Sequence, residues 1–67
     1  MNYLIWSEEH LAWWGPNEQG YTRSILAAGR YPLNKAEQII QRANRFIDPA
    51  FGISFLEIAI PDPLEVT

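Results

Sequence analysis

Residues 34–47 spell NKAEQIIQRANRFI, the stretch of the chain with the strongest regular spacing of apolar residues. These residues recur at intervals of three and four, which places their side chains along one side of an α-helix. The stripe consists of Ala36, Ile39, Ile40, Ala43, Phe46 and Ile47. Asn34 and Glu37 have the spacing of a capping box, so we expect a helix that begins here and buries the stripe.

The same helix carries a second stripe, made of polar residues with the same helical spacing. Its members are Lys35, Gln38, Arg42 and Arg45. The three cations among them, Lys35, Arg42 and Arg45, would face water or a partner. Three positive charges in an acidic protein make a weak footprint for nucleic acid, so direct binding is not expected. A regulator that uses this basic face stays as an alternative function.

Short strands are expected on both sides of the helix. Residues 3–6 (YLIW) favour β-structure, and the polar turn that follows allows residues 11–14 (LAWW) to return as a second strand. Beyond the helix, residues 53–60 alternate with the period of a strand, and Pro61 blocks further pairing.

A second, short helix is expected over residues 23–28, with Thr22 as its cap and Gly29 at its end. The order β-β-α-α-β predicts an α+β fold in which a three-stranded, mainly antiparallel sheet is covered on one face by both helices. We expect the last strand to pair beside the first, in the order 2-1-3. The other sheet face, or an edge, then stays exposed and is the first place to look for function.

The size and composition of the chain limit its possible classes. It has 67 residues, 48% of them hydrophobic and none of them cysteine, which predicts one domain over residues 1–67 with a loose tail at 62–67. The absence of cysteine excludes disulfides and thiolate metal sites. Apolar runs far shorter than the roughly 20 residues of a membrane span, and an N-terminus without a basic region, favour a soluble protein of the cytoplasm.

The sequence offers little for catalysis. Glu8, Glu9 and His10 form its one cluster suited to acid–base chemistry, but neighbouring residues point in different directions. Motifs for nucleophilic catalysis, for zinc proteases and for phosphate-binding loops are missing, and one imidazole with scattered carboxylates does not complete a zinc shell. We therefore expect no enzymatic activity, no catalytic residues, no cofactor and no metal.

Charge is segregated along the chain. Residues 1–22 hold three acidic and no basic residues, residues 23–45 hold five basic and one acidic residue, and residues 46–67 hold four acidic residues. If the outer thirds form the sheet and the middle third is helical, an acidic face opposes a basic one. We predict that the acidic face occupies a partner's nucleic-acid-binding site; the alternative is charge that is merely solvated. The predicted surface comprises Glu8, Glu9, Glu18, Glu57 and Asp62.

Two consecutive tryptophans, Trp13 and Trp14, fall in the second strand. Neighbouring strand residues face opposite sides of a sheet, so at least one indole must lie outside the helix-covered core. An exposed tryptophan is a frequent anchor of protein interfaces, and we predict that Trp13 or Trp14 contacts the partner. The alternative is that the outer indole folds back over the hairpin and stabilises it.

The pattern W-S-x-E-H-x-A-W-W-x-P-N-x-x-G-Y-T at residues 6–22, with A-G-R-Y at 28–31, resembles small phage and prophage proteins. The resemblance extends over roughly residues 3–61. In size, acidity and lack of catalytic groups the chain is similar to anti-CRISPR proteins. This implies a non-enzymatic inhibitor in the host cytoplasm whose partner is a host protein, such as a CRISPR-associated subunit of a type I complex. A phage structural or assembly protein is a further alternative.

Overall fold

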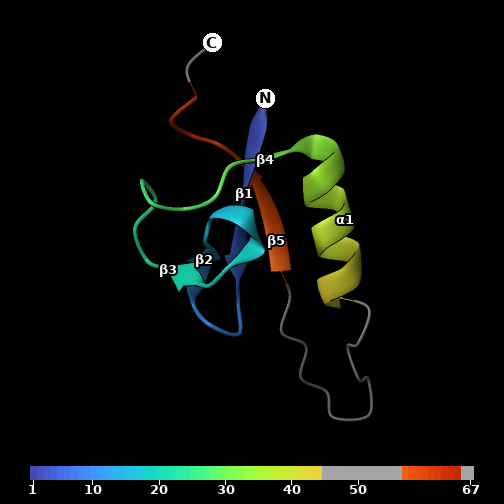
Figure 1. Cartoon of the computed structure of the whole chain (residues 1–67), viewed down its shortest axis with the longest axis horizontal. Coiled ribbons are helices and arrows are strands. Elements are labelled where there is room, and N and C mark those ends of the chain that lie inside the picture. Colours follow the sequence, from blue (N-terminus) through green and yellow to red (C-terminus); the bar gives the residue numbers. More distant parts are fainter. Residues whose placement is uncertain (45–56, 66–67) are drawn as a thin grey trace.

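The structure is a computed structural model that describes residues 1–44 and 57–65 (Figure 1). The elements are β1 (Asn2–Ser7), β2 (Ala12–Trp14), a 3-10 turn η1 (Pro16–Glu18), β3 (Tyr21–Thr22), β4 (Tyr31–Pro32), α1 (Leu33–Asn44) and β5 (Glu57–Pro61). The described part is therefore α+β, as expected, but its sheet contains five strands and not three.

Strand β1 is the centre of this antiparallel sheet. Strand β5 pairs along one edge of β1, from Tyr3 opposite Pro61 to Ser7 opposite Glu57. The other edge is shared by β2, at the C-terminal end of β1, and β4, at its N-terminal end. Strand β3 extends the sheet beyond β2. The expected pairing of the last strand beside the first is confirmed.

The predicted short helix over residues 23–28 is wrong, because residues 25–27 form a turn. The guanidinium of Arg30 explains the difference: its Nη1 donates hydrogen bonds to the carbonyls of Ile25 at 2.7 Å and Ala28 at 2.8 Å. Those carbonyls are thus bound by a side chain. Gly29 does not end a helix; its N–H bonds the carbonyl of Trp14 at 2.9 Å.

Helix α1 is the predicted main helix. It begins at Leu33, so Asn34 lies inside the first turn and not at the cap position that we expected. Within the described part the apolar stripe is confirmed: Ala36 and Ile39 are fully buried. Phe46 and Ile47, like residues 53–56 of the predicted last strand, lie outside the described residues.

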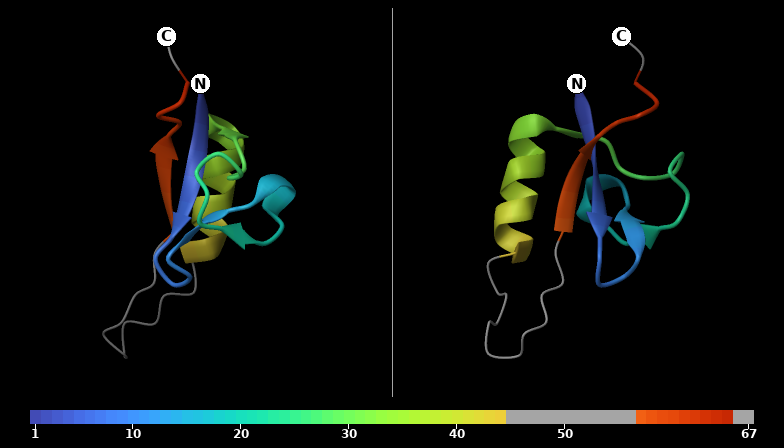
Figure 2. Two further views of the ribbon diagram at one scale, coloured as in Figure 1. Left: turned by 90° about the vertical axis from the view of Figure 1, so that its left-hand side faces the viewer. Right: turned by 180° about the vertical axis from the view of Figure 1, so that it is seen from behind.

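The core lies between α1 and one face of the sheet, where α1 runs alongside β5 and β1 (Figures 1 and 2). Ile5, Tyr31, Ala36 and Ile39 form the buried cluster. Because side chains alternate along a strand, Leu4 and Trp6 of β1 face the opposite side, together with Trp13, Ile58 and Ile60 of their partner strands. Both faces of the sheet therefore carry apolar side chains.

The segment expected to be a loose tail makes several contacts in its described part, residues 62–65. The N–H of Asp62 bonds the carbonyl of Asn2 at 2.9 Å, and its carboxylate pairs with Arg30 at 3.0 Å. The carboxylate of Glu65 lies 3.8 Å from the N-terminal amine. Residues 66–67 lie outside the described residues. Among the described helical residues, none form a helix long and apolar enough to cross a membrane.

Candidate functional site

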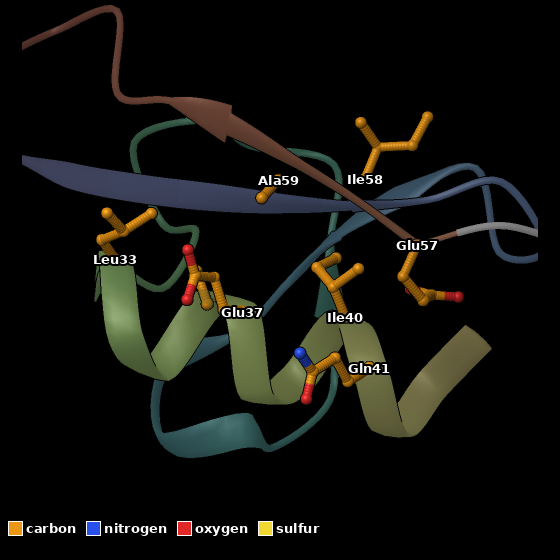
Figure 3. Close-up of a pocket in the computed structure, with 8 residues that line it drawn as sticks. Leu33, Glu37, Ile40, Gln41, Glu57, Ile58 and Ala59 are labelled. Atoms are coloured by element: carbon orange, nitrogen blue, oxygen red, sulfur yellow. The ribbon is translucent and has the colours of Figure 1, made fainter. Parts of the chain in front are cut away.

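An open groove of about 630 Å³ lies between α1 and β5 (Figure 3). We call it the edge groove. It is lined by Leu33, Ala36, Glu37, Ile40, Gln41, Glu57, Ile58 and Ala59. Leu33, Glu37 and Ile40 project from α1 toward β5, whereas Ile58 projects from the far side of the strand (Figure 3). The groove thus has largely apolar walls, and its charged side chains are both carboxylates.

The outer edge of β5 borders this groove, and no strand among the described residues pairs with it. The hydrogen bond from the Asp62 N–H to the Asn2 carbonyl fixes which backbone groups point outward. In an antiparallel pair, hydrogen-bonded and non-bonded positions alternate, so Ile60 and Ile58 direct their N–H and C=O groups toward β1. The same groups of Glu57 and Ala59 point away from β1.

The carboxylate of Glu57 lies inside the sheet and not on a surface. Its residue is only 8% exposed. Oε2 accepts a hydrogen bond from the indole Nε1 of Trp14 at 2.5 Å, and Oε1 accepts one from the hydroxyl of Ser7 at 3.2 Å. Glu57 therefore joins β5 to β2 and β1, although we had predicted it as part of an acidic docking surface.

Burial and the charges of Glu57 and Glu9 raise the pKa of Tyr21 above its ordinary value of 10.0. The ring of Tyr21 also lies 3.8 Å, between centroids, from that of His10. The imidazole of His10 is therefore packed against the ring of Tyr21. His10, which we considered for acid–base chemistry, is exposed and donates its backbone N–H to Ser7.

Glu18 joins the two sets of charged residues that we assigned to opposite faces. Its carboxylate pairs with Lys35 at 2.9 Å and also with Arg42, so η1 is held against the polar stripe of α1. The hydrogen bond from Lys35, with the second from Arg42, holds the pKa of Glu18 below its ordinary value of 4.5. Lys35 and Arg42 are thus already paired within the domain, and Arg45 lies outside the described residues.

The five predicted carboxylates do not gather on one surface. Asp62 is paired with Arg30, whose hydrogen bond lowers the pKa of that carboxyl, and its side chain is 8% exposed. Glu8 and Glu9 are exposed in the turn after β1. Since Glu18 is paired and Glu57 is buried, these two are the members of the predicted set that stay open to a partner.

The tryptophans lie on opposite sides of the sheet, as their alternation requires. Trp14 packs against the core beside α1. Trp13 packs on the other side against Trp6, with ring centroids 5.0 Å apart at an interplanar angle of 70°. Both are partly buried. The packing of Trp13 matches the alternative in which the outer indole covers the hairpin.

The edge groove was not predicted residue by residue. Leu33 is 50% exposed and Ile58 is 40% exposed, and neither was among the candidate binding residues. A signal was present in the sequence of the predicted strand over residues 53–60, which is apolar at both alternating sets of positions although one helix layer covers only one face of a sheet. An uncovered apolar side follows from that pattern.

The described residues contain no group of three or more His, Cys, Asp or Glu side chains placed to hold a metal ion. The edge groove offers apolar side chains and the exposed carboxylate of Glu37, which suit contact with another chain. Comparison of the whole sequence with known protein families, with curated proteins and with solved structures finds no match.

Proposed function

We propose that this protein is a non-enzymatic binding module that docks on another protein through the edge groove. The observation that carries the proposal is the open groove between α1 and β5, where exposed apolar side chains lie beside a strand edge with which no other described strand pairs. Exposed sheet edges are normally shielded in monomeric proteins, because their free N–H and C=O groups pair readily with other chains. Leu33 and Ile58 flank this edge and offer apolar surface for a partner to cover.

The finer proposal is that the partner belongs to a host defence system and that docking inhibits it. It rests on the resemblance to small phage and anti-CRISPR proteins. Glu8, Glu9 and Glu37 are exposed and have no ion pair within the described part of the chain. With a formal net charge of −3, the protein would be steered toward a positively charged surface, such as one that binds nucleic acid.

The test compares two groove variants, Leu33→Glu and Ile58→Glu, with the control Leu26→Glu. Leu26 is 78% exposed and lies outside the groove, so the control adds the same charge elsewhere. Each protein is used for affinity capture from a host lysate that contains a type I CRISPR complex. It is then added to the purified complex in a DNA-binding assay.

We expect the control to retain the wild-type partner and the wild-type inhibition, and both groove variants to lose them. Wild-type capture by both groove variants would refute the groove as the docking site. A captured partner that is not a CRISPR-associated subunit, with DNA binding by the complex unaffected, would refute the anti-CRISPR assignment and leave the binding module in place.

A further inference from the structure

We infer that the polar stripe of α1 contains a binding site for the phosphate backbone of a nucleic acid, and that Glu18 occupies this site as an internal substitute for the ligand. The site consists of Lys35 and Arg42, which both pair with Glu18. Neither residue lines the edge groove, so the ligand of this site is independent of the proposed function.

The carboxylate of Glu18 lies between the two cations. Its Oε2 accepts a hydrogen bond from the ammonium of Lys35 at 2.9 Å, and its Oε1 accepts one from Nη2 of Arg42. Because Lys35 and Arg42 lie about two turns apart on one side of α1, their side chains converge on a single anion. A phosphodiester also presents two terminal oxygens that share a negative charge, and lysine and arginine are its usual partners in proteins.

Both cations stay within reach of a ligand although they are paired. The side chain of Lys35 is 41% exposed and that of Arg42 is 60% exposed. Ion pairs that are so exposed contribute little stability, because water and salt screen them. A strand with many phosphates can therefore compete with a single carboxylate for these two side chains.

The turn that carries Glu18 is fixed by contacts other than its carboxylate. The N–H of Glu18 donates to the hydroxyl of Tyr31 at 3.0 Å, and this hydroxyl donates to the carbonyl of Gly15. The N–H of Gly15 donates to the carbonyl of Gly20 at 2.9 Å. The carboxylate can thus leave the cations by rotation of its side chain while the turn stays in place.

The backbone of this turn indicates that the side chain of Glu18 has a role of its own. Asn17 and Glu18 have φ angles of 58° and 57°, in the left-handed region that favours glycine and asparagine. Asn17 fits this preference, whereas a glutamate at the second position is disfavoured. What a glutamate provides here, and a glycine would not, is the carboxylate between Lys35 and Arg42.

Glu18 thereby acts as an autoinhibitory contact. While it is in place, the two cations offer a phosphate little free charge, which agrees with our expectation that the protein does not bind nucleic acid directly. Without the charge of Glu18, Lys35 and Arg42 are two like charges held near each other, and they repel until an anion binds between them. Removal of that one charge should therefore open the site.

The experiment measures binding of a short, fluorescently labelled single-stranded DNA to the 67-residue protein by anisotropy at low salt. Glu18→Gln removes the charge and keeps the size of the side chain, and Glu18→Ala is a second variant with the same loss of charge. The matched control is Glu8→Gln, which removes one charge from the exposed turn after β1. Arg42→Gln is then combined with Glu18→Gln. Inorganic phosphate is titrated separately, and thermal unfolding shows whether each variant is folded.

We expect Glu18→Gln and Glu18→Ala to bind the DNA at least about tenfold more tightly than the wild-type protein, and Glu8→Gln to differ from it by no more than about twofold. An approximately tenfold rise in salt should weaken this binding about fivefold for each phosphate that is neutralised. Addition of Arg42→Gln should return the affinity to that of the wild-type protein.

Equal affinities of Glu18→Gln and Glu8→Gln would overturn the inference, because the gain would then reflect net charge alone. A gain that survives Arg42→Gln would overturn it as well, since the DNA would then bind elsewhere. Saturable binding of inorganic phosphate by Glu18→Gln, without tighter binding of DNA, would exclude the nucleic acid in favour of a free phosphate. Failure of both Glu18 variants to fold would contradict a turn that is held without its carboxylate.

Discussion

Trp14 and Glu57 are 43 positions apart in the sequence, yet the indole Nε1 of one donates to the carboxylate Oε2 of the other. The second carboxylate oxygen accepts from Ser7, which is fully buried in β1. One acidic side chain therefore connects three strands. Buried charge is stable only when it is hydrogen-bonded, so these two donors are a condition for the fold of β5 beside β1.

Glu57→Ala should lower the free energy of unfolding by about 2 kcal/mol, because it leaves the donors of Trp14 and Ser7 without an acceptor. Urea unfolding followed by tryptophan fluorescence measures the loss. Glu57→Gln keeps an oxygen acceptor and should cost less than Glu57→Ala. As a control, Glu37→Ala removes an exposed carboxylate and should change stability by no more than about 0.5 kcal/mol. Equal stabilities of the Glu57→Ala and Glu37→Ala proteins would contradict this role of Glu57.

Ile39 is fully buried between α1 and the sheet. Ile39→Ala removes apolar contact and leaves a cavity, so we expect a loss of about 2–5 kcal/mol, enough to unfold a small domain of modest stability. Thermal unfolding by circular dichroism provides the measurement. Leu26→Ala, at a position that is 78% exposed, is the matched control and should leave the midpoint almost unchanged. A folded Ile39→Ala protein with the wild-type midpoint would place the core elsewhere.

Gly29 lies where two segments approach closely. A Cβ at this position would be 2.7 Å from the carbonyl oxygen of Gly15 and 2.8 Å from the hydroxyl of Tyr31. Gly29→Ala should therefore cost about 1–3 kcal/mol through forced displacement of these groups. Ala27→Ser, in the exposed turn nearby, is the control for a small change in the same loop. If Gly29→Ala and Ala27→Ser have the same denaturant midpoint, a Cβ at position 29 does not clash with Gly15 and Tyr31.

The pKa values of Glu18 and Asp62 are lowered in the folded protein by their hydrogen bonds from Lys35 and Arg30. Between the ordinary and the folded values the unfolded chain binds more protons, so stability rises with pH there. The contribution should be complete above the ordinary values of 4.5 and 3.8 and should be lost as pH falls through the lowered folded values. Urea midpoints at about pH 6 and pH 3 measure this loss.

Glu18→Gln removes one of the two titrating pairs, so its urea midpoint should change less between these pH values than that of the wild-type protein. Glu8→Gln is the control, because Glu8 is exposed and lies in a turn without an ion pair among the described residues. The assignment of acid sensitivity to Glu18 is wrong if both variants show the wild-type pH dependence.

The elements that were predicted correctly are those whose pattern is local. The spacing of Ala36 and Ile39 defines a helix whatever surrounds it, and the alternation of apolar residues around Ile58 defines a strand. The two-residue strands β3 and β4 were missed because they exist only through pairing with β2 and β1. The short helix was predicted wrongly because Arg30 binds the carbonyls of Ile25 and Ala28, a contact that no local pattern contains.

The candidate site was only partly predictable, because contacts between residues far apart in the sequence also determine which of its side chains are exposed. An exposed edge or face was expected from the ratio of strands to helices, and among the described residues Ile58 of β5, which is 40% exposed, faces the side opposite α1. The charged residues were assigned by their position along the chain, whereas their role depends on which cations lie nearby. Glu18 meets Lys35 across the fold, and Glu57 turns inward to Trp14. Both are tertiary contacts that charge blocks in a sequence do not reveal.

Pro61 at the outer edge of β5 has a consequence for the behaviour of the protein in concentrated solution. An open strand edge is a template on which further copies can stack and grow into fibrils. Pro61 has no N–H, so a copy that paired along this edge would lack one hydrogen bond of the ladder at that position in every layer. Pro61 therefore works against the growth of fibrils from this strand.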